Sequence, residues 1–144
     1  MCTRLVGTIE KRAIEIAKRY ERRHGRVVVD FQRAKRGFRG FDLLSFSKDR
    51  KDVRSIEVKG TQINKRGNAL IPIVYETGFT RTKKLVATHL YLVVFSHGLR
   101  ARFLKLVVFR AEEIKTEFVR EERHYRVNLP AEVMREKMRR KTED

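Results

Sequence analysis

Apolar positions in the first part of the chain follow two different periods. Between residues 8 and 23 they recur at spacings of three and four, which predicts an amphipathic helix: Ile9, Ala13, Ile16, Ala17 and Tyr20. Gly25 stands where a helix C-terminal cap is expected. Residues 26–31 are dominated by β-branched side chains and predict a strand directly after this helix.

Further strands are predicted over 41–47 and 53–60, with a charged turn between them. Residues 69–74 form a short strand candidate, in which Pro72 indicates a sheet edge or a break. The apolar runs over 90–95 and 102–109 predict two strands that are buried on both faces.

Helices are predicted over 80–88, 110–118 and 131–140, and an extended segment over 125–129. This order predicts an α/β fold with one central mixed β-sheet flanked by helices. The length fits a single domain over 1–144, with a core over about 8–110 and a C-terminal helical extension over about 110–144.

The net charge of the chain says most about its partner. Lys and Arg number 35 and Asp and Glu 18, so the formal net charge is 35 − 18 = +17. Such an excess predicts a polyanionic partner, and we expect nucleic acid, with DNA ahead of RNA. The alternative is a highly charged surface without a specific partner, of the kind found in heat-stable proteins.

Cysteine usage and the apolar runs narrow the class of protein. Cys2 is the single cysteine, which excludes an intramolecular disulfide and a thiolate zinc cluster. The N-terminus lacks the apolar stretch of a signal peptide, and no apolar run is long enough to span a membrane. We therefore expect a cytoplasmic protein without a membrane partner.

The two strands at 41–47 and 53–60 place charged residues together. If they pair around a turn at 49 and 50, opposed residue numbers sum to about 99, so Asp42 faces Glu57. Opposed residues share one face of the sheet, with Cβ atoms about 4.5–5.5 Å apart. Lys59 shares this face, while Ile56 and Val58 point to the other and anchor the strand.

Two adjacent carboxylates repel each other unless a cation lies between them. Oxygen donors of this kind favour Mg²⁺ or Mn²⁺, and the Val58 carbonyl is a further candidate ligand. Lys59 would orient or deprotonate an attacking water, or stabilise developing negative charge. The alternative is a simple ion pair of Asp42 with Lys59 beside a solvated Glu57. A second Glu-x-Lys triplet, Glu113-Ile114-Lys115, falls in a predicted helix and is interpreted as a solvated surface.

These residues resemble a known family. Gly40-Phe41-Asp42-Leu43 followed by Ile56-Glu57-Val58-Lys59-Gly60 is similar to the PD-(D/E)XK nuclease superfamily, and within it to the C-terminal domain of NO VEIN-type proteins. The resemblance covers residues 8 to 110 approximately. It implies a restriction-endonuclease-like core in which Asp42 and Glu57 bind metal and Lys59 completes the motif.

The resemblance also implies a catalytic Glu on the first helix. Glu10 matches the family pattern Glu-x-x-Ala, with Glu15 as the competitor on the same helix, and either residue could instead be solvated. Where close relatives carry an Asn-Glu pair near the second helix, this chain has Lys83 and Lys84. These two lysines are candidates for contact with nucleic acid, against the alternative of a solvated face.

A basic loop over 33–40 precedes the proposed site and carries the other two nucleic-acid candidates, Arg36 and Arg39, against the alternative of a flexible surface loop. The resulting hypothesis is a Mg²⁺-dependent nuclease that hydrolyses DNA phosphodiester bonds. The alternative is a non-cleaving nucleic-acid-binding module of the same fold that works with a partner protein. A basic RNA-binding protein is a third interpretation, and the sequence leaves a homodimer open.

Overall fold

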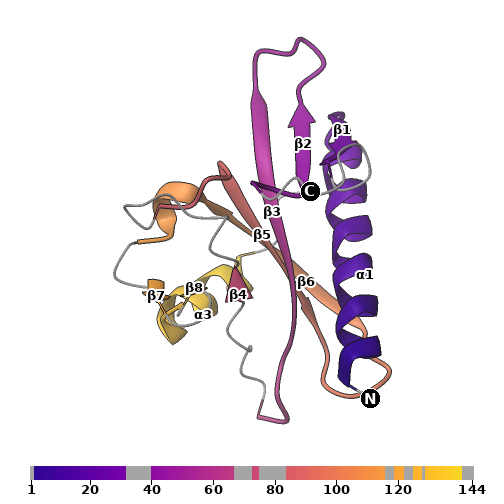
Figure 1. Cartoon of the computed structure of the whole chain (residues 1–144), viewed down its shortest axis with the longest axis vertical. Coiled ribbons are helices and arrows are strands. Elements are labelled where there is room, and N and C mark those ends of the chain that lie inside the picture. The colour runs from indigo at the N-terminus through magenta and orange to yellow at the C-terminus, as the bar shows by residue number, and fades with distance from the viewer. Residues whose placement is uncertain are drawn as a thin grey trace.

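The computed structural model describes residues 2–31, 40–66, 73–74, 84–115, 119–121, 125–127 and 129–140. Figure 1 shows the elements in chain order along these residues. They are α1 (Cys2–Arg23), β1 (Val27–Asp30), β2 (Leu43–Phe46), β3 (Val53–Gln62), β4 (Ile73–Val74), β5 (His89–Phe95), β6 (Phe103–Arg110), a 3₁₀ turn (Ala111–Glu113), β7 (Val119–Glu121), β8 (Tyr125–Val127) and α3 (Ala131–Arg139).

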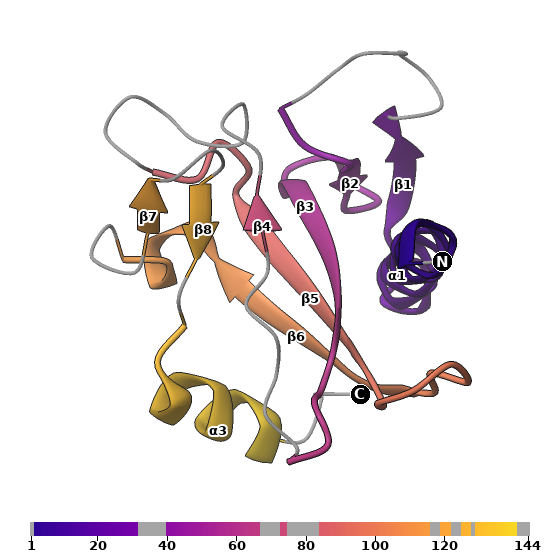
Figure 2. The ribbon, with the colours of Figure 1, turned by 60° about the horizontal axis from the view of Figure 1, so that its bottom comes forward.

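A five-stranded sheet in the order β1-β2-β3-β5-β6 forms the centre of the fold. Strands β3 and β5 are parallel and the other neighbours are antiparallel, so the sheet is mixed. A second sheet in the order β4-β8-β7 lies away from α1 (Figure 2). The prediction of an α/β fold with a central mixed sheet flanked by helices is confirmed.

The pairing of β2 with β3 has the register expected from the sequence. Leu43 pairs with Ile56 and Phe46 with Val53, so paired residue numbers sum to 99. The turn between the strands closes through the Ser47 amide, which donates to the Asp52 carbonyl at 2.9 Å. This register decides which side chains of β3 share a face with the residues around Asp42.

Helix α1 covers one face of the sheet because its apolar stripe carries small residues. Ala13 and Ala17 are fully buried against side chains that include Leu43 and Ile56. Gly60 of β3 completes the close approach, since a Cβ atom there would lie 2.7 Å from Ile9 Cγ2. The helix and β3 are therefore in contact along the segment that carries Glu57 and Lys59.

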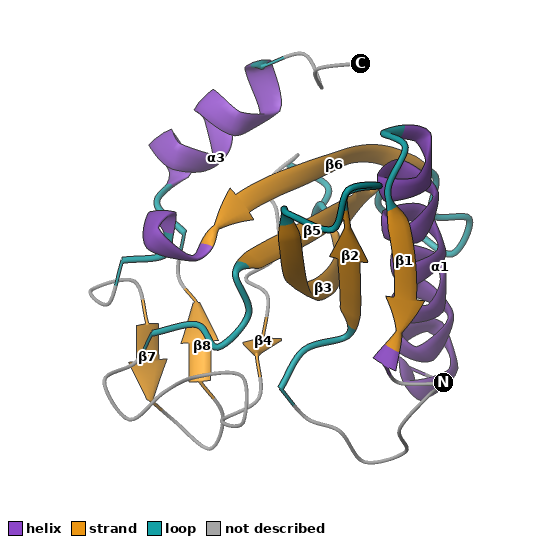
Figure 3. Ribbon diagram, turned by 90° about the horizontal axis from the view of Figure 1, so that it is seen from above, coloured by secondary structure: helices purple, strands orange, loops and turns teal. Residues whose placement is uncertain are grey.

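The opposite face buries a second apolar cluster that includes Leu92, Val107 and Phe109. Three partly buried side chains of α3 pack against this cluster: Val133, Met134 and Met138. Lys137 of the same helix donates from Nζ to the Val108 carbonyl at 3.2 Å. The C-terminal helix thus docks on its own domain, and Figure 3 shows α1 and α3 on different sides of the sheet.

The helix predicted over 80–88 is wrong for residues 84–88, and residues 80–83 lie outside the described part of the chain. Leu85 and Ala87 are buried in the apolar cluster beneath α3. Thr88 is bonded to β3, because its amide donates to Ser55 Oγ at 2.9 Å and its Oγ1 accepts from the Ser55 amide at 3.0 Å. These contacts fix the bend at residues 86–88 against β3 before β5 begins.

The helix predicted over 110–118 is also wrong for most of its described residues. A single 3₁₀ turn spans Ala111–Glu113, and the chain is again in a strand from Val119. Arg110 still belongs to β6, and its amide donates to Glu113 Oε2 at 2.9 Å, so a short turn follows the strand in place of an α-helix. Among the described helices, none combines the length and apolar character needed to cross a bilayer.

Candidate active site

Asp42 lies at the point where β2 begins, and its carboxylate is held against β3. The Asp42 amide donates to the Ile56 carbonyl at 2.9 Å, and the Val58 amide donates to Asp42 Oδ2 at 2.8 Å. The side chain therefore takes the place of a backbone carbonyl in the ladder, one residue beyond Leu43. This bond fixes one carboxylate oxygen at the edge of β3.

Glu57 and Lys59 point to the face of β3 away from α1. Between and before them, Val58 and Ile56 are buried in the cluster beneath the helix, as the alternation of a strand requires. The exposed fractions of the Glu57 and Lys59 side chains are 10% and 13%, and Lys59 Nζ lies 3.3 Å from Glu57 Oε1. Two opposite charges are thus buried together beside the Asp42 carboxylate.

The surroundings of Glu57 oppose its negative charge. Burial and then the charge of Asp42 raise the pKa of Glu57 from 4.5 to about 7, against the opposing effect of Lys59. The charge of Glu10 adds to the increase. A carboxyl group whose pKa lies near neutrality, next to a second carboxylate, is typical of functional sites.

Lys59 keeps its proton in spite of its burial. Burial alone lowers the pKa of Lys59, but the charges of Glu57, Asp42 and Glu10 outweigh this effect and raise the pKa above 10.5. The ammonium group is therefore positive at neutral pH. Its position suits a group that binds phosphate oxygens or stabilises developing negative charge.

The two glutamates of α1 have different surroundings. Glu10 is exposed, and its charge reaches both Glu57 and Lys59. Glu15 instead lies 3.1 Å from Lys18 Nζ, and Lys18 also pairs with Asp30 at 2.6 Å. The structure therefore brings Glu10 into electrostatic contact with the site and ties Glu15 to the lysine.

The second Glu-x-Lys triplet differs in its environment. Glu113 accepts from the Arg110 amide at 2.9 Å and lies 2.8 Å from Lys137 Nζ. Partial burial would raise the pKa of Glu113, but these partners outweigh burial and lower it. The solvated surface expected for this triplet is thus wrong at Glu113, which makes a structural ion pair with α3.

The donor set around Asp42 suits a hard divalent cation. Asp42 and Glu57 supply carboxylate oxygens. The Val58 carbonyl leaves β3 on the same side as the Val58 amide, toward Asp42 and past the end of β2, because the two groups of one strand residue point the same way. Among the described residues, no three or more His, Cys, Asp or Glu side chains gather as a ready metal cluster.

The nucleic-acid candidates are largely outside the described part of the chain. Arg36, Arg39 and Lys83 fall in the undescribed ranges 32–39 and 75–83. Lys84 is described and exposed, just before the buried Leu85. The contacts of these four residues with nucleic acid stay predictions.

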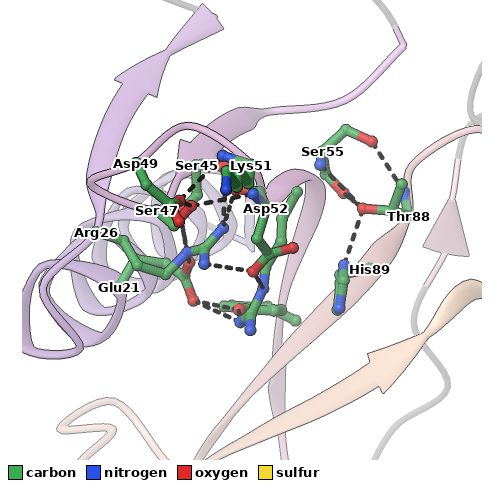
Figure 4. A network of polar contacts seen from close by, with 12 residues as sticks. Glu21, Arg26, Ser45, Ser47, Asp49, Lys51, Asp52, Ser55, Thr88 and His89 are labelled. Carbon is green, nitrogen blue, oxygen red and sulfur yellow. Dashed lines mark hydrogen bonds and ion pairs between the residues drawn. The ribbon is translucent and has the colours of Figure 1, made fainter.

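A buried polar network was not predicted from the sequence (Figure 4). Glu21 of α1 is fully buried, and Arg26 Nε lies 2.9 Å from its Oε2. Ser45 Oγ donates to the same oxygen at 2.5 Å, while the Tyr91 hydroxyl donates to Oε1. Arg54 Nη1 lies 3.5 Å from Oε1 and donates to the Tyr91 hydroxyl at 3.3 Å.

This network has a structural purpose, because its charges satisfy one another. The sequence signal is slight: Glu21 sits among exposed basic residues of the helix, and Tyr91 is the one polar-tipped side chain in the interior of β5. Burial of the hydroxyl and its bond to Glu21 raise the pKa of Tyr91. The network joins α1, the start of β1, β2, β3 and β5.

Comparison with known proteins gives one family. The family model described as Protein NO VEIN, C-terminal matches residues 9–95, which include α1 from Ile9 onward, β3, β5 and the segment around Asp42. Comparison with curated proteins gave no match, and comparison with solved structures gave none either.

Proposed function

The chain belongs to the NO VEIN C-terminal family, and from this premise we propose that it is a Mg²⁺- or Mn²⁺-dependent nuclease of the PD-(D/E)XK type that hydrolyses DNA phosphodiester bonds. The observation that carries the proposal is the burial of Glu57 beside Asp42, with Lys59 on the same face of β3. Folding makes these charges costly, and a cation or a phosphate would offset the cost.

Asp42, Glu57 and the Val58 carbonyl would hold the divalent cation. Such an ion lowers the pKa of a bound water and neutralises charge on a phosphate. The bond from the Val58 amide to Asp42 Oδ2 holds the Asp42 carboxylate in one orientation before any ligand arrives. Glu57 shares its proton with solvent near pH 7, so it can present an anionic oxygen at little cost once a positive charge is near.

Lys59 acts as a fixed positive charge. Its raised pKa means that it is protonated at neutral pH, which favours charge stabilisation over abstraction of a proton from water. The short separation of 3.3 Å from Glu57 Oε1 keeps the ammonium beside the carboxylate pair. Glu10 adds negative charge from α1 and would help to attract the cation.

The net charge of +17 supports a nucleic-acid substrate. Contacts between lysine or arginine and phosphate release condensed counterions, which favours binding of long polyanions. The carboxylate pair beside Lys59 favours cutting over binding alone.

A second candidate function is a non-cleaving nucleic-acid-binding module that works with a partner protein. The ion pair of Lys59 with Glu57 favours it, because this contact already compensates charge in the site without a metal. The two functions differ in one readout, which is hydrolysis that depends on a divalent cation.

The test is incubation of the protein with plasmid, single-stranded and branched DNA, with Mg²⁺, with Mn²⁺ and with EDTA. We expect cleavage only with a divalent ion. Asp42→Ala and Lys59→Ala should each reduce the cleavage rate by a factor of about 100 or more. Loss of one group that stabilises charge in the transition state usually costs about 10²–10³-fold in rate. DNA binding in EDTA should persist in both variants.

The matched control uses the other triplet. Lys115→Ala removes an exposed lysine in the same Glu-x-Lys pattern and should cut DNA at the parent rate. Binding of DNA without divalent-dependent cleavage of any of the three substrates would reject the nuclease and leave the binding module. Equal loss of activity in Lys115→Ala and Lys59→Ala would remove the assignment of the site to β3.

A further inference from the structure

The hairpin that joins β5 to β6 leaves large apolar side chains in water. Leu99 is 82% exposed, and Phe103 and Leu104 of β6 are 47% and 43% exposed. Single exposed apolar residues are ordinary, but three within six positions of one hairpin are not a random scatter. We name residues 96–102 the β5–β6 tip.

Exposed cations belong to the tip or stand within four residues, along the chain, of the two side chains that bond to it, Arg12 and Gln62. Arg100 and Arg102 belong to it and are exposed. Lys65 and Arg66 are exposed just past the end of β3, and Lys11 is exposed on α1. Leu99 is therefore an exposed apolar residue with cations in the same loop. Proteins that insert an apolar side chain between bases combine it with arginines that contact the phosphates.

The backbone of the β5–β6 tip is held in place from two sides. Gln62 Nε2 at the end of β3 donates to the Gly98 carbonyl at 2.9 Å and to the Ser96 carbonyl at 3.2 Å. On the other side, Arg12 Nη1 of α1 donates to the carbonyl of the buried Ala101 at 2.6 Å. The ends of the tip also bond to each other, since the Arg102 amide donates to Ser96 Oγ at 2.8 Å.

This bracing lets the tip turn sharply and aim Leu99 outward. Gly98 has φ of +98°, a conformation that glycine adopts without strain, and no atom would lie within 4 Å of a Cβ there. Figure 1 shows the hairpin beside the N-terminal half of α1, in agreement with the bond from Arg12. A rigid backbone with one exposed leucine loses little entropy when the leucine is buried by a partner.

The residue that anchors the tip belongs to the same strand as Glu57 and Lys59. Gln62 follows Lys59 by three residues in β3, so the bonds that hold the tip are about 10 Å along the strand from the lysine at roughly 3.3 Å per residue. Successive nucleotides of one strand advance by about 3.4 Å along a duplex. One nucleic-acid segment is long enough to contact both places.

We propose that the β5–β6 tip is a nucleic-acid contact in which Leu99 wedges against unstacked bases and Arg100 and Arg102 contact the flanking phosphates. This inference rests on the proposed function for its partner, yet it concerns binding and not hydrolysis. The net charge of +17 decides the occupant, because a second copy of this chain would bring like charge against the exposed arginines.

The experiment measures binding in EDTA, so that no strand is cut. The probe is a short DNA duplex with 2-aminopurine in place of adenines, together with its single strand. The parent protein should raise the 2-aminopurine fluorescence of the duplex, because unstacking removes quenching. Leu99→Ser should abolish the increase and weaken binding about fivefold to tenfold, the low end of what loss of one stacked base contact costs.

Two matched controls separate the wedge from general surface effects. Val27→Ser removes another exposed apolar residue, 56% exposed on the opposite edge strand, and should behave as the parent. Arg100→Gln should reduce the slope of log affinity against log salt by about one contact, while Arg23→Gln, at the exposed end of α1, should not.

Each outcome decides the proposal. Equal fluorescence and affinity for the parent and Leu99→Ser would overturn it, as would absence of any increase with the parent. A parent that is a dimer in solution and becomes a monomer through Leu99→Ser, with DNA binding unchanged, would assign the tip to self-association and also overturn it. Loss of binding in Leu99→Ser without any cleavage by the parent would support the wedge while rejecting the nuclease.

Discussion

Glu57 holds its carboxyl group in surroundings that resist negative charge. Glu113 occupies the same position in the second Glu-x-Lys triplet, but its pKa is shifted in the opposite direction. Lys137 and the Arg110 amide stabilise the anionic form of Glu113. The tripeptide pattern is the same in both places. Burial and the nearby Asp42 charge make the difference, and they distinguish the candidate active site from a structural ion pair.

The first prediction concerns stability against pH in metal-free protein. The pKa of Glu57 is about 7 when folded and near 4.5 when unfolded, so the folded chain binds more protons between these values. The free energy of unfolding should therefore fall as pH rises through this window, by on the order of 3 kcal/mol from this residue. Urea denaturation at several pH values, in EDTA, measures the change.

Glu57→Gln isolates this contribution, since the amide does not titrate. The difference in unfolding free energy between variant and parent should grow in favour of the variant as pH rises from about 4.5 to 7. Asp42→Asn should shift the decline of the parent to lower pH, because the Asp42 charge is one cause of the raised Glu57 pKa. If the unfolding free energies of the parent and Glu57→Gln change equally with pH across this window, Glu57 does not have the raised pKa.

At the scale of elements, α1 packs on the face of β3 opposite to Glu57 and Lys59 and thereby fixes the position of this strand. Gly60 permits the approach, since an added Cβ would lie 2.7 Å from Ile9 Cγ2, 3.2 Å from the Ile9 carbonyl oxygen and 3.3 Å from Ala13 Cβ. The contact with backbone cannot be relieved by a change of rotamer. It lies next to Lys59 in β3 and next to Glu10 in α1.

The second prediction is that Gly60→Ala destabilises the fold by about 1–3 kcal/mol, as overpacking of a tight helix–strand contact does. The midpoint of urea denaturation measures it. In an Ile9→Ala background the same change should cost less, because the nearest atom is absent. An equal cost in both backgrounds would show that Ile9 is not the contact that resists the Cβ.

Prediction from sequence worked best for elements with long, regular patterns. The first helix, the strand that follows it, the existence of the two apolar strands and the β2–β3 register were anticipated, because periodicity and a short charged turn decide them locally. The burial on both faces predicted for the apolar strands holds for β5 but is wrong for the first half of β6, where Phe103 and Leu104 are exposed. The pairing of Leu43 with Ile56 is the clearest case. That register made the neighbourhood of Asp42 and Glu57 predictable before any coordinates.

Elements decided by distant partners were not predictable. Residues 84–88 were expected to continue a short helix, but the reciprocal bonds of Thr88 with Ser55 fix them in a bend against β3. Glu21 has the spacing of a solvated helix residue, and its burial depends on Arg26 just before β1, Arg54 of β3 and Tyr91 of β5. No local pattern contains that information.

At the scale of the whole molecule, the Glu21 network ties α1 to β2, β3 and β5 and to Arg26, the residue before β1. A fully buried carboxylate is tolerated here because two arginines, a serine and a tyrosine surround it. Arg26 extends the network to the β2–β3 turn, since its Nη1 lies 2.6 Å from Asp52 Oδ2. The turn between β2 and β3 and the C-terminal end of α1 are thereby fixed relative to each other.

The third prediction is that Glu21→Ala costs about 3–5 kcal/mol, because it leaves the Arg26 guanidinium buried without its partner. Thermal or urea unfolding measures the loss. Glu112→Ala removes an exposed glutamate and should change stability by less than about 0.5 kcal/mol. Similar losses in the two variants would show that the network contributes nothing beyond an ordinary surface charge.

The central claim is that Asp42 and Glu57 form a cation site, and titration calorimetry with Mn²⁺ tests it most directly. At a pH just below the Glu57 pKa of about 7, we expect binding of the ion to release a proton, seen as heat that depends on the ionisation enthalpy of the buffer. Asp42→Asn and Glu57→Gln should each abolish this binding, while Lys115→Ala should retain it. Absence of binding by the parent, or binding that survives both carboxylate variants, would contradict the claim.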